Sequence, residues 1–428
     1  MLKTKNVDIK KEIIAGVTTF CTMMYIVIVN PTMLSTPGTG MSFSGVLTGT
    51  VLLCFLMTLL MGVYANLPFA VGPGMGINAF FTYTILLRGQ IPWPIGLGIV
   101  FWSGVLFLLC SLTPVRTQIA AAIPENIRYA VATGMGIFLT FIGLRNAKLV
   151  VSDPVTFVKL GTLDQTAGFV FLGLIFMVIL LRRKNPFAFL GGIALVTGLS
   201  YWAGQVHLPQ RWLSHPDFDS TFLKLDIWGA FQLAFLPAIV SIFFTDLFDS
   251  ISTFVGCSYS AGLKDRKGQP LHMKEGLIVD AWATLSAGVL GTSAGTAYVE
   301  SAAGIEAGGR TGWTSVVTAF CFLPCLFLAP LVQVIPSYAT APVLILVGGM
   351  MFRNVTELKL SYFEDLVPAF LTIVLIPLTF SITQGLLWGL IAHVTLFILS
   401  GRRKEIKPMM YGLFSLSIFL LLIENFHR

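Results

Sequence analysis

Two apolar segments of this chain are interrupted by closely spaced glycines and carry polar residues inside them. The first lies at 67–81 and contains Pro73 and Asn78, and the second lies at 291–304 and contains Glu300. Irregular backbone within a lipid bilayer is tolerated only where protein or a water-filled cavity surrounds it. Two such breaks at corresponding places in the two halves of a chain are typical of the binding site of a secondary transporter.

The composition indicates that these breaks lie in a membrane. Hydrophobic residues make up 55% of the 428 residues and charged residues only 11%, whereas a soluble domain carries about 25% charged residues. A chain of this length accommodates roughly a dozen or more helices of about 20 residues each. We therefore expect a multi-pass membrane protein with the lipid bilayer as its main partner.

The apolar runs predict an all-α protein with 14 membrane-spanning segments, seven on each side of a polar loop at 205–228. The expected ranges are 13–34, 43–65, 68–88, 93–113, 127–144, 167–182 and 186–204, then 229–257, 275–290, 293–309, 312–335, 340–353, 366–380 and 382–400. Because seven is odd, the second set is inverted relative to the first, and the broken segment is third in each set. This order is that of a 7+7 inverted repeat.

The chain accordingly divides into four parts. Residues 1–204 form the first repeat, 205–228 the polar loop between the repeats, and 229–400 the second repeat. Residues 401–428 hold a basic linker and a further apolar stretch at 407–425. That stretch fits a fifteenth span, a helix lying in the membrane interface, or a segment packed against the bundle.

Basic residues gather in the hydrophilic gaps between the expected spans. The formal net charge is +7, from 27 Lys and Arg against 20 Asp and Glu. With a cytoplasmic N-terminus, most of the basic clusters fall on the cytoplasmic side, as membrane insertion favours. These clusters are Lys3, Lys5, Lys10 and Lys11, then Arg116, Arg182–Lys184, Lys264–Lys267 and Arg402–Lys404, and the exceptions are Arg145, Lys148 and Lys159. We therefore expect a protein of the cytoplasmic membrane that has no nucleic-acid partner.

The first break offers backbone and amide groups to a ligand. Gly72, Gly74 and Gly76 permit unusual backbone angles and close approach, and a half-helix is expected to begin near Gly74–Gly76. Asn78 lies in the first turn of that half-helix, and its amide supplies both donors and an acceptor. This combination suits a neutral heterocycle, whereas the structural alternative is a helix kink with a buried asparagine.

The second break adds a carboxylate. Residues 296–299 can be extended, and Glu300 and Ser301 can open a second half-helix. A carboxylate is stabilised near a helix N-terminus, and an ionisable residue inside a membrane is a functional candidate by default. Glu300 can accept hydrogen bonds from ring N–H groups and can carry a proton.

Two further acids lie in the eighth expected segment and one in the ninth. Asp246 and Asp249 are three residues apart, so they share a helix face. Two carboxylates this close in a medium of low dielectric do not both ionise readily, which makes the pair a candidate proton carrier or an oxygen site for Na⁺. Asp280 either tunes this site or bonds a neighbouring helix.

The aromatic residues nearest to these polar groups include Phe80, Phe248 and Tyr298. They can stack on a planar base, although packing is the alternative for each of them. The six cysteines form no CxxC or CxxH pattern, so we expect no metal and no cofactor. The spans contain no nucleophile–base pair, and we expect no enzymatic activity.

Three strings together resemble the AzgA-like purine permeases of the nucleobase–cation symporter-2, or nucleobase–ascorbate transporter, superfamily. They are 72–81 (GPGMGINAFF), 245–250 (TDLFDS) and 298–312 (YVESAAGIEAGGRTG). The resemblance extends over roughly 10–400. In the eighth segment the wider superfamily often has Glu-Ser-Ile-Gly-Asp where this chain has Asp249-Ser-Ile-Ser-Thr. This departure leaves open which of Asp246 and Asp249 faces the base.

The resemblance implies a fold and a mechanism. Segments 3 and 10 would each hold a short strand and a half-helix. Segments 1–4 and 8–11 would form a substrate-binding core that moves as an elevator against a gate of segments 5–7 and 12–14. The site would comprise Gly76, Asn78, Asp246, Asp249, Glu300 and Ser301, with the proton handled by Asp246, Asp249, Asp280 and Glu300.

The resemblance also implies a cargo. The expected function is import of adenine, guanine or hypoxanthine by proton symport, with Na⁺ as the alternative ion. The rival function is a transporter or channel of the same fold for uracil, xanthine or a sulfate-like anion. The preferred purine and the oligomeric state stay open, and a homodimer is one option.

Overall fold

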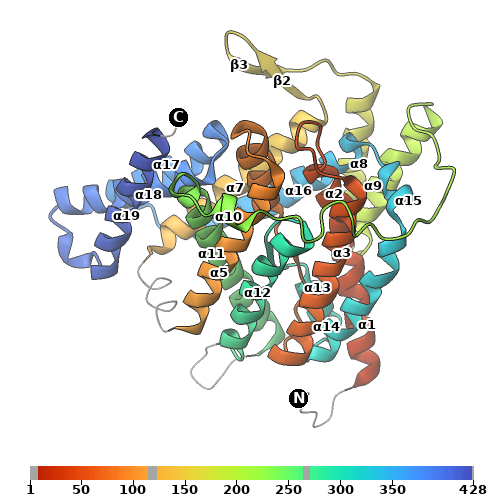
Figure 1. The fold of residues 1–428 in the computed structure, drawn as a ribbon, viewed down its shortest axis with the longest axis horizontal. Coiled ribbons are helices and arrows are strands. Elements are labelled where there is room, and N and C mark those ends of the chain that lie inside the picture. Colours follow the sequence, from red (N-terminus) through yellow and green to blue (C-terminus); the bar gives the residue numbers. More distant parts are fainter. Residues whose placement is uncertain (1–7, 114–122, 264–269, 427–428) are drawn as a thin grey trace.

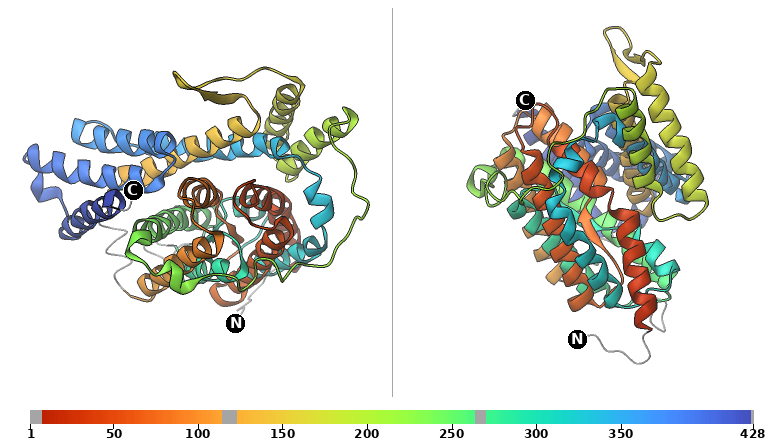
Figure 2. Two further views of the ribbon diagram at one scale, coloured as in Figure 1. Left: turned by 45° about the horizontal axis from the view of Figure 1, so that its top comes forward. Right: turned by 90° about the vertical axis from the view of Figure 1, so that its right-hand side faces the viewer.

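The computed structural model describes residues 8–113, 123–263 and 270–426. The described chain is mostly α-helix, and its strands are short. The helices form two layers, a compact cluster and a longer row beside it (Figure 2, left). Of the basic residues used above for orientation, Lys3, Lys5, Arg116 and 264–267 lie outside the described residues.

The compact cluster contains helices from both halves of the chain (Figure 1). Its full-length helices are α1 (Ile9–Met23), α2 (Ile26–Leu34), α3 (Phe43–Leu60) with η1 (Met61–Ala65), α5 (Trp93–Leu112), α11 (Leu236–Ala261), α12 (Met273–Leu290) and α14 (Gly312–Phe322). Helix α1 packs on α14, α3 packs on α12 and α14, and α5 packs on α11 and α12. Helices far apart in the sequence therefore share one core.

Two broken segments lie within this cluster. The first consists of β1 (Val71–Pro73), α4 (Met75–Ala79) and η2 (Phe80–Arg88), and the second of β4 (Gly295–Ala297) and α13 (Ser301–Glu306). Strand β4 begins one residue before the extended stretch that the sequence predicted at 296–299. The half-helices begin within the ranges expected for them.

The helical row consists of α7 (Glu125–Asn146), α8 (Gln165–Arg182), α9 (Ala188–Trp202), α16 (Ala341–Phe352), α17 (Phe363–Thr379) and α18 (Ile382–Leu399). Helix α7 packs on α16 and α17, α8 on α9, and α17 on α18. Short helices connect these elements: α10 (Ile227–Ala230), η3 (Leu233–Phe235), η4 (Leu323–Phe327), α15 (Ala329–Gln333), η5 (Ser337–Thr340), η6 (Arg353–Glu357) and η7 (Arg403–Glu405).

Glycines end the two helices that carry the acids. Helix α11 ends before Gly262, which has φ +69°, and α12 ends before Gly291, which has φ +80°. Left-handed backbone of this kind closes a helix at little cost only in glycine. Gly291 thereby turns the chain from α12 directly into the second break.

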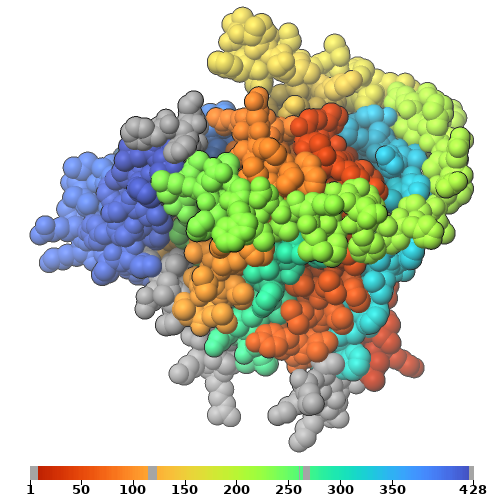
Figure 3. All heavy atoms as spheres, viewed as in Figure 1, coloured from red at the N-terminus to blue at the C-terminus, as the bar shows by residue number. Residues whose placement is uncertain are grey.

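The polar loop at 205–228 crosses the face of the compact cluster (Figure 3). Asp217 holds it there, since its carboxylate accepts a hydrogen bond from the Ser44 hydroxyl at 2.6 Å. The Leu223 backbone N–H also donates to the Val289 carbonyl at 2.9 Å. The loop therefore covers one end of α3 and of α12.

A β-hairpin projects from the helical row, and sequence analysis did not predict it (Figure 1). Strand β2 (Val150–Asp153) pairs antiparallel with β3 (Phe157–Leu160). The Asp153 carboxylate stabilises the turn by accepting from the backbone N–H of Val155 at 2.9 Å and of Thr156 at 3.0 Å. The Asp-Pro turn between two runs of β-branched and aromatic residues is the signal that would have identified it.

Eight helices of the described chain are long and apolar enough to cross a bilayer. They are Ile9–Leu34, Phe43–Ala65, Trp93–Leu112, Glu125–Asn146, Gln165–Arg182, Leu233–Tyr259, Ser337–Glu357 and Ile382–Leu399. Each overlaps a span expected from the sequence. These helices confirm a multi-pass α-helical membrane protein.

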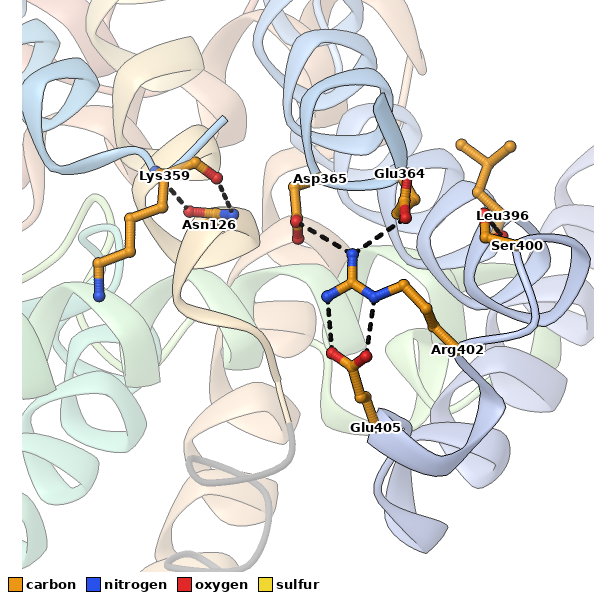
Figure 4. Close-up of polar contacts among 8 residues, drawn as sticks. All are labelled: Asn126, Lys359, Glu364, Asp365, Leu396, Ser400, Arg402 and Glu405. Carbon is orange, nitrogen blue, oxygen red and sulfur yellow. Dashed lines mark hydrogen bonds and ion pairs between the residues drawn. The ribbon is translucent and has the colours of Figure 1, made fainter. Parts of the chain in front are cut away.

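The apolar stretch at the C-terminal end forms α19 (Pro408–Phe426), which packs against α18 and α11. Arg402 fixes the linker before it by contacting three carboxylates, those of Glu364, Asp365 and Glu405 (Figure 4). The shortest of these ion pairs, between Arg402 Nη2 and Glu405 Oε2, measures 2.6 Å. The C-terminal helix is thus attached to both layers.

Candidate functional site

The two broken segments meet at one place inside the compact cluster. Strands β1 and β4 pair antiparallel, with Val71 opposite Ala297 and Pro73 opposite Gly295. The pairing continues on both sides, because the Gly74 N–H donates to the Ala294 carbonyl and the Tyr298 N–H donates to the Ala70 carbonyl, each at 2.9 Å. The short sheet satisfies backbone groups that a bilayer cannot hydrate.

Side chains from neighbouring helices complete this sheet. The Thr58 hydroxyl accepts from the Val71 N–H at 2.9 Å and donates to the Val71 carbonyl at 3.1 Å. Ser301, expected as a ligand of the substrate, accepts from the Ala70 N–H at 3.0 Å and is fully buried. The hydroxyl of Tyr298 donates to the Pro73 carbonyl. Both residues therefore join one break to the other.

Two of the acids are fully buried against the second strand. Asp246 and Asp280 both have 0% exposure. The Thr284 hydroxyl donates to Asp246 Oδ2, and the Ser250 hydroxyl donates to Asp280 Oδ2. Among the described residues, neither Oδ1 atom has a hydrogen-bond partner. A carboxylate in such surroundings is costly to ionise without an opposite charge.

The other two acids are partly exposed. Asp249 lies on α11 and Glu300 directly precedes α13, which packs on α11, and both residues are half-buried. The four acids therefore divide into an enclosed pair, Asp246 and Asp280, and an accessible pair, Asp249 and Glu300.

Asn78 lies in a buried polar network. Its amide oxygen accepts from the Ser293 hydroxyl, and its side chain has 0% exposure. The Ser293 hydroxyl oxygen also lies 3.4 Å from the Asn30 amide oxygen, and the Asn30 amide nitrogen donates to Thr50 at 2.7 Å and to Thr292 at 2.8 Å. Asn78 thus connects the start of α4 to α2, α3 and the second break.

Gly76, Phe80 and Phe248, also expected at the site, are buried. A Cβ atom on Gly76 would lie 2.2 Å from the Met135 Cε of α7, so this glycine admits a side chain from the helical row. Phe248 packs against Phe244 with ring centroids 5.8 Å apart. Phe80 is 2% exposed.

Several residues of the site were missed by sequence analysis. They are Tyr25, Asn30, Thr50, Thr284, Thr292 and Ser293. Asn30 alone gave a usable signal, as an amide within a long apolar run. The others are hydroxyl residues, which are common in membrane helices without any functional role.

Comparisons with known proteins show which family the chain resembles. The model of the Permease family matches residues 10–387. Adenine permease AdeP of Escherichia coli is 37% identical over 95% of this chain and 91% of its own length. Guanine/hypoxanthine permease PbuO of Bacillus subtilis is 36% identical over 98% of this chain and 99% of its own length.

A solved structure shows the same fold. The transmembrane domain of a cyanobacterium bicarbonate transporter, BicA, superposes with a TM-score of 0.69 over 90% of this chain and 98% of that chain, at 16% sequence identity. The family match and the apolar helices together define a polytopic permease. The chain belongs to the nucleobase–ascorbate transporter family, which confirms the family resemblance drawn from its three motifs.

Proposed function

We propose that this protein imports a purine nucleobase, adenine, guanine or hypoxanthine, by proton symport across the cytoplasmic membrane. The observation that carries the proposal is the accessible acid pair, Asp249 and Glu300, placed where the two broken segments meet. The similarity to adenine and guanine/hypoxanthine permeases over nearly the whole chain supports the same cargo.

The two acid pairs divide the work in this proposal. Asp249 and Glu300 accept hydrogen bonds from the ring N–H groups of the base, since ionised carboxylates are strong acceptors. Asp246 and Asp280 hold the transported proton, because two enclosed carboxylates are more stable when they share one. Asn78 joins the first break to the second through its hydrogen bond with Ser293. Gly76 leaves room for Met135 of the row to pack against the first break.

The two layers supply the movement. In the proposal the compact cluster is the core of segments 1–4 and 8–11, and the helical row is the gate of segments 5–7 and 12–14. The fourteen segments form two inverted repeats with a cytoplasmic N-terminus, and the core moves as an elevator. Coupling then requires that proton and base each raise the affinity for the other.

The experiment is uptake of radiolabelled adenine, guanine and hypoxanthine by a purine-transport-deficient bacterium that expresses the chain. Accumulation of one base that a protonophore abolishes supports the proposal and identifies the cargo. Accumulation that depends on Na⁺ and survives the protonophore would show that the coupling ion is Na⁺ and not H⁺. Failure to accumulate any of the three, with the protein shown in the membrane, contradicts the proposal and favours another substrate of the same fold.

The site assignment has its own test. Glu300→Gln removes the negative charge but keeps the shape, so we expect KM for the transported base to rise roughly tenfold or more. The matched control is Glu306→Gln on the same short helix, whose carboxylate forms an exposed ion pair with Lys184 and should leave KM near the wild-type value. Wild-type uptake by the Glu300 variant would remove Glu300 from the site.

A further inference from the structure

Tyr25 lies at a break in the first membrane segment. Helix α1 ends at Met23 and α2 begins at Ile26, so Tyr25 occupies the short link between them. Its side chain is 1% exposed. A tyrosine buried this completely inside a membrane protein needs a partner for its hydroxyl.

That partner is a candidate ligand of the substrate. The Tyr25 hydroxyl donates to Glu300 Oε1 at 2.6 Å. The Thr22 hydroxyl, one turn earlier on α1, lies 3.5 Å from the Glu300 carbonyl oxygen. The end of α1 and the link that follows it therefore contact both the backbone and the side chain of Glu300. A carboxylate has lone pairs for about four hydrogen bonds, so the bond from Tyr25 leaves room for ring N–H donors.

The ring of Tyr25 contacts the opposite layer. Its centroid lies 4.8 Å from that of Phe189, with the two planes inclined by 54°. Phe189 belongs to α9 of the helical row and is 4% exposed. Tyr25 thus contacts Glu300 of the cluster with its hydroxyl and Phe189 of the row with its ring.

We propose that Tyr25 is a positioning residue that sets the orientation of Glu300 according to the position of the helical row, an inference that rests on the proposed function. While Tyr25 packs on Phe189, its hydroxyl holds Glu300 in the orientation that accepts the base. When the cluster moves past the row, the ring loses Phe189, and the hydroxyl no longer restrains Glu300. The affinity for the base therefore differs between the two positions of the cluster, as directional release requires.

The test is a double-mutant cycle on substrate affinity. Tyr25→Phe removes the hydroxyl and keeps the ring, and Phe189→Leu removes the stacked ring and keeps an apolar side chain. Equilibrium binding of radiolabelled adenine, guanine and hypoxanthine to the purified proteins gives Kd, and uptake gives KM and Vmax. Tyr338→Phe is the matched control, because its hydroxyl bonds Gln205 at 2.8 Å on the exposed side of the row.

We expect Tyr25→Phe to raise Kd and KM for the cargo by roughly tenfold, the effect of losing one hydrogen bond to a charged group. Phe189→Leu should raise Kd about threefold alone and not at all in the Tyr25→Phe background, because the two residues act in series. Tyr338→Phe should bind as the wild type does. A purely structural role would lower the amount of folded protein without this non-additivity.

Two outcomes overturn the inference while the proposed function stands. One is unchanged Kd in Tyr25→Phe, and the other is fully additive effects of the two substitutions, each with wild-type transport intact. If the wild type itself neither binds nor accumulates any of the three bases, the proposed function fails first and the inference falls with it. The wild-type measurement in the same series distinguishes these results.

Discussion

At the scale of single residues, the main finding is that the four acids of the candidate site lie in two different environments. Asp246 and Asp249 lie on the same helix, yet the first is enclosed with Asp280 and the second is half-buried beside Glu300. Residues three apart on a helix point in directions that differ by about 60°, so Asp246 and Asp249 can have different surroundings although they share a face. This division leads to a prediction for each pair.

Asp246→Asn should separate binding from coupling. The substitution keeps an oxygen that can accept from the Thr284 hydroxyl but removes the group that carries the proton. We expect Kd for the base to stay within about threefold of the wild-type value, since Asp246 has 0% exposure and the proposed function gives it no contact with the base. Protonophore-sensitive accumulation should be lost, while exchange of internal for external base continues.

The matched substitution is Asp249→Asn, which should instead weaken binding roughly tenfold. Binding in detergent, accumulation in cells and exchange in proteoliposomes measure the three properties separately. If Asp246→Asn weakens binding as strongly as Asp249→Asn does, the division of the acids into two roles is wrong.

At the scale of elements, the broken segments could be predicted, whereas their pairing could not. Glycines and prolines at 67–81 and 291–304 show where helices must stop. The register that places Val71 opposite Ala297 depends on how two distant parts of the chain fold together. The same limit applies to Tyr25, whose contact with Glu300 spans 275 residues of sequence. The β2–β3 hairpin had a local signal, its Asp-Pro turn. The hairpin lies between two expected membrane segments, and the prediction of membrane segments did not consider strands there.

Close contact between helices of the cluster depends on particular glycines. A Cβ atom on Gly104 of α5 would lie 2.3 Å from the Leu285 backbone nitrogen of α12, so the two helices would have to move apart. We expect Gly104→Ala to lower the free energy of unfolding by about 1–3 kcal/mol, a typical cost of overpacking. Thermal unfolding of the purified protein in detergent measures this loss.

The control is another glycine inside a helix. A Cβ atom on Gly198 of α9 meets nothing within 4 Å. Alanine there should leave stability unchanged or raise it by about 0.5–1 kcal/mol, because glycine in the middle of a helix carries an entropic cost. Equal destabilisation by both substitutions would mean that the loss of stability does not come from the close contact between Gly104 and Leu285.

The ion cluster around Arg402 should make the C-terminal attachment sensitive to acid. Hydrogen bonds from Arg402 lower the pKa of Glu405. The pKa of Glu364 is lowered by a hydrogen bond from the backbone N–H of Glu364 itself and by a hydrogen bond from Arg402. A carboxyl whose pKa is lower in the folded state stabilises the fold above its unfolded pKa. That contribution is complete above the ordinary value of 4.5 and disappears as the pH falls below it.

We therefore expect Arg402→Gln to lower the unfolding temperature at pH 7 and to flatten its dependence on pH between about 5 and 3. Arg403→Gln is the control, because it changes the same net charge on an exposed neighbour. Parallel pH profiles for the wild type and the Arg402 variant would show that the ion cluster in Figure 4 contributes nothing to acid sensitivity.

At the scale of the whole molecule, the proposed transport requires the compact cluster to move against the helical row. The two layers contact each other at several places, among them an ion pair between Lys184 Nζ and Glu306 Oε2 at 2.9 Å. Lys184 follows α8 of the row, and Glu306 ends α13 of the cluster. Both side chains are largely exposed, at 80% and 61%, so this ion pair contributes little to the stability of the fold. It nevertheless shows a position at which a cross-link can join the two layers.

Replacing both residues with cysteine and joining them with a short, cleavable thiol cross-linker should stop transport. We expect uptake to fall to background on cross-linking and to return after cleavage, because the bridge fixes the cluster in one position. The single variants and the wild type, treated alike, are the controls, since the six natural cysteines are buried or half-buried. Equilibrium binding of the base should survive the cross-link, because Glu306 and Lys184 lie outside the acid pairs. Undiminished uptake by the fully cross-linked protein would mean that the layers do not separate at this point, and the elevator movement would have to be abandoned.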